Sequence, residues 1–123
     1  MWSKSAGIYN PLDFDHKAVR REIEGELDVF GDGTVVVFPT PGHTPGHQSL
    51  RVQLETGTVV LAADCCYLRR TLDTLHLPRA VYNQGQMLAS LGALRALQSG
   101  GARIFFGHDL EFWKTVPQAQ PIA

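Results

Sequence analysis

The segment from residue 39 to residue 50, which reads PTPGHTPGHQSL, decides how this sequence is interpreted. His43 and His47 stand four positions apart, with a proline and a glycine between them. Proline lacks an N–H donor and glycine has a poor helical propensity, so both disfavour a helix. We therefore predict a rigid loop at the end of a strand. A helical H-E-x-x-H zinc motif is excluded, and Thr44 stands where that motif has its glutamate.

Segments on both sides of this loop have the patterns of strands. TVVVF before the loop and TVVLAA after it are apolar and rich in β-branched residues, as in buried strands, and QSLRVQL alternates apolar with polar residues. A GDG turn at 31–33 precedes the first of these strands, and Ile23, Leu27 and Val29 before the turn are also spaced as strand residues. The sequence therefore predicts several strands that pack in one sheet.

One long helix is predicted after residue 83. Asn83 can cap it, Gln86 completes a box-like pattern, and glycines at 100 and 101 end it. Its apolar stripe consists of Met87, Leu91, Leu94 and Leu97, with Leu88 beside them. Residues 65–82 show no clear period, ARIFF reads as a short strand, and LEFWKT reads as one or two helical turns that contain the core residues Phe112 and Trp113. This order predicts an α/β layered fold.

Three polar side chains stand near the ends of predicted strands. These residues are His43, Asp64 and His108. The ends of adjacent strands lie close together, and a sheet holds the loops there rigidly. Two imidazoles and one carboxylate that converge at such an edge are natural ligands for zinc or a similar metal.

The composition excludes several classes of function. The chain has 123 residues, which suits one domain, with 44% apolar residues, 19% charged residues and a net charge of −1. This balance gives no argument for a nucleic-acid partner or a membrane surface, and no apolar run approaches a membrane span. The sequence begins without the apolar region of a secretory signal. Cys65 and Cys66 are adjacent and form no disulfide framework, and free thiols favour a cytoplasmic location.

Three segments together resemble the metallo-β-lactamase fold superfamily. They are TPGHTPGHQSL, AADCCY and IFFGHDLEFW, and the resemblance covers about residues 20–115. Glyoxalase II relatives share the G-H-T-P-G-H loop, but the D-x-x-Y and F-F-G-H-D elements are most similar to the N-acyl homoserine lactonases, which open the lactone ring of quorum-sensing signals. The resemblance implies the C-terminal half of an αβ/βα sandwich, with a mainly antiparallel or mixed sheet and one long flanking helix.

The resemblance also implies roles for individual residues. His43 would join the first of two zinc ions, His108 the second, and Asp64 would bridge both, although another divalent metal could replace zinc. Tyr67 would bind the substrate near its lactone carbonyl, and a metal-bound hydroxide would open the ring. His47 is implied to hold the loop by hydrogen bonds rather than to bind metal.

The H-x-H-x-D-H motif of this superfamily is absent. The nearest string is PLDFDH at 11–16, which lacks both leading histidines and which we interpret as a polar turn, with Asp15 or His16 left as candidates for some contact with the site. We therefore expect residues 1–123 to form a single partial domain whose apolar sheet face seeks a partner. The chain could be a fragment without its N-terminal half, a half-protein completed by homo-oligomerisation, or a degenerate remnant.

The remaining residues of interest are expected to have structural roles. Cys65 and Cys66 are expected to be small packing residues, His76 a surface or core-edge residue, and Asp109 a helix cap. The side chains of Arg69 and Arg70 are expected to be solvated, and Leu72, Leu75, Leu77 and Val81 to be core residues unless they contact an acyl chain. The function expected first is a metal-dependent lactonase. The alternatives are another ester or thioester hydrolase of the same fold, or an inactive scaffold.

Overall fold

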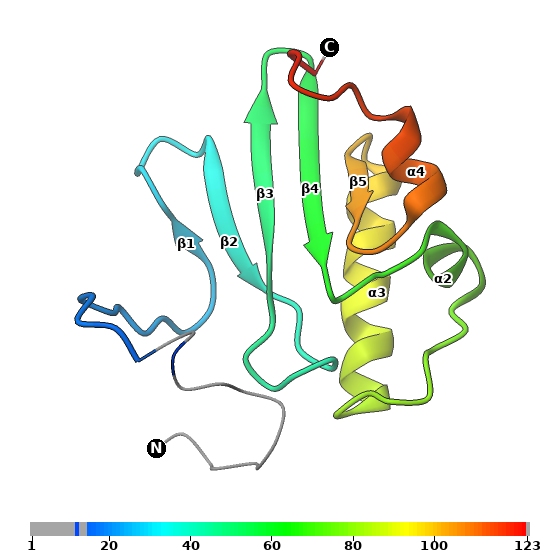
Figure 1. The fold of residues 1–123 in the computed structure, drawn as a ribbon, viewed down its shortest axis with the longest axis horizontal. Coiled ribbons are helices and arrows are strands. Elements are labelled where there is room, and N and C mark those ends of the chain that lie inside the picture. Colours follow the sequence, from blue (N-terminus) through cyan, green and yellow to red (C-terminus); the bar gives the residue numbers. More distant parts are fainter. Residues whose placement is uncertain (1–11, 13–14, 123) are drawn as a thin grey trace.

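A five-stranded sheet forms the centre of the protein. The structure, a computed structural model, describes Leu12 and residues 15–122. Its elements are β1 (Leu27–Asp28), β2 (Val35–Pro39), β3 (Gln48–Leu54), β4 (Gly57–Ala63), α2 (Arg69–Thr74), α3 (Gln84–Ser99), β5 (Arg103–Phe106) and α4 (Leu110–Thr115). The strand order is β1-β2-β3-β4-β5, as Figure 1 shows. Each of the strands β1, β2 and β3 pairs antiparallel with the next, and β5 pairs parallel with β4.

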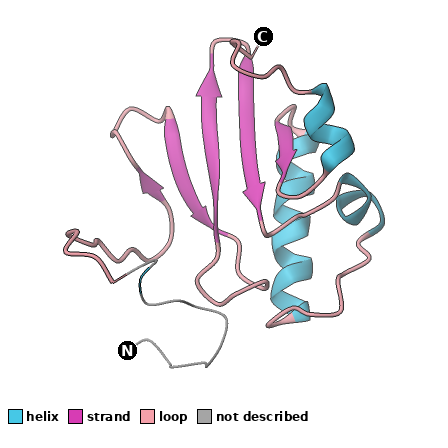
Figure 2. Cartoon of the chain, in the orientation of Figure 1, coloured by secondary structure: helices cyan, strands magenta, loops and turns pink. Residues whose placement is uncertain are grey.

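The parallel β4–β5 pair requires a crossover, which α2 and α3 provide. Figure 2 shows α3 running along the sheet beside β4 and β5. Its buried residues include Met87, Leu91 and Leu94, which confirms the predicted apolar stripe. The hydrophobic core lies between this helix and one face of the sheet, where the buried residues include Phe38, Val60, Ala62, Leu91, Leu94 and Phe106.

The opposite face of the sheet is also apolar. Val37, Leu50, Leu61 and Phe105 form one cross-strand row from β2 to β5. Phe105 is buried and makes edge-to-face contacts with Phe112 and Trp113 of α4, whereas Leu61 is 38% exposed. The α4 aromatic residues therefore cover the β5 end of this row, and the expectation that the rest seeks a partner stays a prediction.

The structure corrects four details of the sequence-based prediction. Residues 65–82 are not irregular throughout, because α2 forms at Arg69–Thr74. The first strand is only Leu27–Asp28, because the Asp28 carboxylate accepts hydrogen bonds from the N–H groups of Gly31 and Gly33 and turns the chain there. Leu88 is 42% exposed on the outer side of α3. Trp113 is 37% exposed rather than part of the core, whereas Phe112 packs against the core as predicted.

The described helices include none that is long and apolar enough to cross a membrane. Half of the 11–16 segment, at positions 11, 13 and 14, falls outside the described residues. Within it, Asp15 and His16 are exposed.

Candidate functional site

The loop that carries His43 is held firmly against the start of α3. Its two ends are joined by a hydrogen bond from the Thr40 N–H to the His47 carbonyl, 2.9 Å long. The Gly42 carbonyl accepts from the Asn83 N–H at 3.0 Å. Gly42 has a φ of 133°, and a Cβ there would lie 2.4 Å from the Met87 nitrogen, so only glycine allows this close approach. The prediction of a rigid loop is therefore confirmed.

The chain segments that follow β4 and β5 lie so close together that position 107 has no space for a side chain. A Cβ on Gly107 would lie 2.3 Å from the Ala63 carbonyl oxygen. The N–H groups of Gly107 and His108 donate to the carbonyls of Cys66 and Tyr67, both at 3.0 Å. Two loops that are more than forty residues apart in the sequence are thus joined directly after their strands.

A left-handed residue turns the chain at the end of β4. Ala63 has a φ of 48°, a conformation that costs a non-glycine residue roughly 1–2 kcal/mol. The pairing between β4 and β5 is irregular at the same place, between Leu61 and Ala63. This kink places Asp64 outside the ladder and directs its side chain toward the neighbouring loops.

The three predicted ligands come together at this edge of the sheet. The His108 Nε2 atom lies 2.8 Å from Asp64 Oδ1, and the His43 Nε2 atom lies 3.3 Å from Asp64 Oδ2. Each imidazole therefore faces a different oxygen of one carboxylate. The side chains are 25% exposed for His43, 41% for Asp64 and 59% for His108, so the cluster is open to solvent.

Tyr67 lies beside both histidines. Its ring centroid is 4.3 Å from that of His108 and 5.6 Å from that of His43. Burial, and secondarily the negative charge of Asp64, raise the pKa of the Tyr67 phenol above its ordinary value. The phenol therefore stays protonated near neutral pH and can donate a hydrogen bond.

His47 makes different contacts from His43. Its Nε2 atom accepts a hydrogen bond of 3.1 Å from the backbone N–H of Asp64, and its Nδ1 atom lies 2.9 Å from the Thr40 hydroxyl. Desolvation lowers the pKa of His47, against an opposing effect of Asp64. Both ring nitrogens are thus engaged within the protein, as the implied role of holding the loop requires.

The donor set agrees with a metal site in its chemistry, but the three side chains are not arranged around a single ion. Zinc prefers imidazole and carboxylate ligands about 2.0–2.2 Å away, which places two ligands of one tetrahedral ion about 3.4 Å apart. The separation of 3.3 Å between His43 and Asp64 suits such a pair, whereas 2.8 Å between His108 and Asp64 is a direct hydrogen bond. Among the described residues, no group of three or more His, Cys, Asp or Glu side chains is arranged to hold a metal ion.

Asp109 has a function beyond the cap that the sequence predicts. Its Oδ1 atom accepts from the Phe112 N–H and caps α4, as expected. Its Oδ2 atom accepts from the Arg69 N–H at 2.8 Å, at the first residue of α2. One carboxylate thus holds the starts of two helices, and these hydrogen bonds, first that of Arg69, lower the pKa of Asp109.

The adjacent cysteines are packing residues, as predicted. Cys65 and Cys66 are fully buried. Burial, the first cause for both, raises the pKa of the Cys65 thiol to about 12 and that of the Cys66 thiol to about 11. Both side chains therefore stay neutral beside Asp64.

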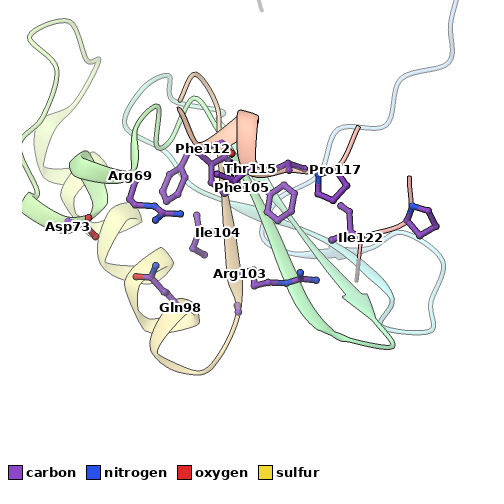
Figure 3. Close-up of a pocket in the computed structure, with 14 residues that line it drawn as sticks. Arg69, Asp73, Gln98, Arg103, Ile104, Phe105, Phe112, Thr115, Pro117 and Ile122 are labelled. Atoms are coloured by element: carbon purple, nitrogen blue, oxygen red, sulfur yellow. Dashed lines mark hydrogen bonds between the residues drawn. The ribbon is translucent and has the colours of Figure 1, made fainter. Parts of the chain in front are cut away.

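Two hollows lie near these loops. One of about 670 Å³ has Tyr67, Arg70, His76 and Leu77 in its wall, whereas Leu72 is buried in the core and offers no surface to a ligand. Figure 3 shows another, of about 760 Å³, between β5, α2 and α4. Its wall includes Arg69, whose guanidinium lies 5.8 Å from the ring centroid of Phe112, and none of the three predicted ligands.

Comparison with known proteins finds lactonases among the relatives of this chain. The chain is 31% identical over 122 residues to the N-acyl homoserine lactonase AttM of Azorhizobium caulinodans, which covers 94% of this chain and 46% of that protein. It is 36% identical over 91 residues to the N-acyl homoserine lactonase AiiA of Bacillus thuringiensis, which covers 72% of this chain and 35% of that protein. The chain is a relative of the N-acyl homoserine lactonases. No protein-family model matches it.

Solved lactonase structures show the same fold. A structure of N-acyl homoserine lactone hydrolase, with the product N-hexanoyl-L-homoserine at its catalytic metal centre, aligns with a TM-score of 0.69 and 34% identity, over 79% of this chain and 38% of that one. The dizinc lactonase AidC is similar in fold, with a TM-score of 0.50 and 21% identity over 64% of this chain and 28% of that one. This chain therefore spans less than half the length of the lactonase relatives that it matches.

Proposed function

We propose that this chain forms part of the active site of a metal-dependent hydrolase that opens the lactone ring of N-acyl homoserine lactones. The observation that carries this proposal is the single carboxylate of Asp64, whose two oxygens face imidazole nitrogens from two different loops. A carboxylate shared in this way suits a bridge between two metal ions. The lactonase relatives give the substrate class.

Each residue of the cluster has a proposed task. His43, Asp64 and His108 would hold divalent metal, with zinc as the first candidate, and the metal when bound would supply Lewis acidity and lower the pKa of water to about 7. Tyr67 would donate a hydrogen bond from its protonated phenol to the carbonyl oxygen as negative charge develops there. The hollow beside Tyr67 offers a place for the acyl part of the substrate.

The remaining metal ligands would come from outside this set. Three donors are too few for two ions, since even one catalytic zinc ordinarily has three protein ligands. We propose that residues 1–123 are a partial domain and that a segment corresponding to the rest of a lactonase, or a second copy of this chain, completes the site. The apolar face that contains Leu50 and Leu61 gives such a partner a surface to cover.

A second candidate is a scaffold that does not hydrolyse by itself. It is favoured by the direct contact between His108 and Asp64, which leaves no space for an ion between those two atoms. In that case the chain alone would retain no metal after dialysis.

Metal content tests the proposal. Purified chain is equilibrated with zinc, dialysed and analysed for metal per chain, beside the variants Asp64→Asn and Asp73→Asn. Asp73 is an exposed aspartate of α2 and serves as the matched control. If a second copy of this chain completes the site, we expect the wild type and Asp73→Asn to retain metal and Asp64→Asn to lose it. Equal retention by all three would contradict the assigned ligand. No metal in the wild type would mean that the three donors of this chain are too few by themselves, and the same analysis would then be repeated with the segment that corresponds to the rest of a lactonase; a chain that still retained no metal would favour the scaffold.

Substrate turnover separates the hydrolase candidates. Chain that retains metal is assayed with an N-acyl homoserine lactone and with a glutathione thioester. Faster hydrolysis of the lactone is the expected result. Faster hydrolysis of the thioester would replace the lactonase assignment with a glyoxalase II type of activity.

A further inference from the structure

A continuous chain of hydrogen bonds connects two backbone groups on either side of Ala63. It begins at the Asp64 N–H, which donates to His47 Nε2 at 3.1 Å. His47 Nδ1 lies 2.9 Å from Thr40 Oγ1, which lies 2.7 Å from Ser49 Oγ. The Ser49 hydroxyl lies 3.2 Å from the Ala62 carbonyl oxygen. Thr40 and Ser49 are 0% and 3% exposed, so water competes little for these bonds.

The two ends of this chain fix the direction of every bond in it. A backbone N–H can only donate, so Nε2 of His47 carries no proton, and a neutral imidazole then has its proton on Nδ1. At the other end a carbonyl can only accept, so the single proton of Ser49 is directed to Ala62. Thr40 must then donate to Ser49 and accept from His47 Nδ1. Both ends give the same tautomer.

This series of hydrogen bonds spans the residue at which β4 ends. Ala63, the residue it spans, has the left-handed conformation that directs Asp64 out of β4. The kink removes the Asp64 N–H from the ladder, and His47 satisfies this donor instead. Because His47 belongs to the same loop as His43, the bond also links that loop to the residue whose carboxylate His43 contacts.

We propose that His47 is a positioning residue, held by Thr40 and Ser49 as its Nδ1–H tautomer, which fixes the Asp64 backbone and so aims the Asp64 carboxylate at His43 and His108. The claim that this orientation of Asp64 matters for hydrolysis rests on the proposed function. The His47 tautomer and its hydrogen bond to the Asp64 N–H can be measured in the protein without metal or substrate, and so do not depend on that function.

Nuclear magnetic resonance of the full chain tests both parts. Ring nitrogen shifts of His47 in ¹⁵N-histidine-labelled protein report which nitrogen carries the proton, and hydrogen exchange reports the protection of the Asp64 amide. The variant Thr40→Val removes the hydroxyl and keeps the shape of the side chain, and Thr40→Ser keeps the hydroxyl as the conservative control. Circular dichroism checks that each variant is folded.

We expect the Nδ1–H tautomer in the wild type and in Thr40→Ser. In Thr40→Val the Asp64 amide should exchange about tenfold faster than in Thr40→Ser, because the imidazole has lost its acceptor and no longer holds one tautomer. A proton on Nε2 of His47 in the wild type would overturn the proposal, and this measurement needs no variant. Unchanged exchange of Asp64 in a folded Thr40→Val would overturn it too. A chain with the expected tautomer but no lactone hydrolysis would leave this inference standing and count only against the proposed function.

Discussion

Replacing Gly107 by alanine should separate the ends of β4 and β5. The added Cβ would lie 2.3 Å from the Ala63 carbonyl oxygen, whereas carbon–oxygen contacts are ordinarily about 3.3–3.6 Å, so the strand ends must move apart by about 1 Å. That movement would break the two bonds of 3.0 Å that Cys66 and Tyr67 accept from Gly107 and His108. At about 1 kcal/mol each, the free energy of unfolding should fall by about 2 kcal/mol.

The same movement should disturb the candidate site. His108 would shift with Gly107, and its contact of 2.8 Å with Asp64 would lengthen beyond hydrogen-bond distance. Gly46→Ala is the matched control, because nothing lies within 4 Å of the added Cβ and its φ is not positive. Urea unfolding measures the stability of the two variants, and the His108 ring signals in NMR report the contact. If Gly107→Ala were as stable as Gly46→Ala, with His108 signals like those of the wild type, this explanation of the strand ends would be wrong.

Three further predictions concern the loops around Asp64. Tyr67→Phe should leave the metal content of the completed enzyme unchanged and lower its turnover on the order of 100-fold, because one donor to the developing oxyanion is lost; elemental analysis and a lactone assay measure the two effects. Asp109→Ala should lower the free energy of unfolding by about 2 kcal/mol, since two helix starts lose their cap, whereas Asp109→Asn retains one acceptor oxygen and so keeps one of the two caps. Because the folded-state pKa of Asp109 is lowered, the ionic part of its contribution is present above the carboxyl pKa of the unfolded chain and is lost as pH falls through the folded value. Urea titrations of the wild type and Asp109→Asn should therefore converge in acid. Cys65 and Cys66 should resist iodoacetamide at mildly alkaline pH until the chain is unfolded, because burial raises both thiol pKa values to about 12 and about 11; mass spectrometry would detect early alkylation, which would contradict their burial.

Local chemistry fixes the elements that the sequence predicts well. The apolar runs TVVVF and TVVLAA and the alternating segment QSLRVQL predict three strands. The structure forms strands there, at 35–39, 57–63 and 48–54. Asn83 caps α3 as predicted, because a cap depends only on residues within one turn. The family resemblance, carried by motifs within single loops, is confirmed by the lactonase relatives. Residues next to each other in the chain decide these features.

Tertiary structure decides the features that the sequence could not predict. α2 is absent from the prediction because its start is held by Asp109, which is forty residues away in the chain. The approach of Gly107 to Ala63 and the kink at Ala63 depend on how β4 and β5 align. Sequence patterns bring His43, Asp64 and His108 to the ends of strands. Only the packing of those strands places two imidazoles on one carboxylate and His47 on the backbone beside it, because such contacts depend on distances between loops that no local preference sets.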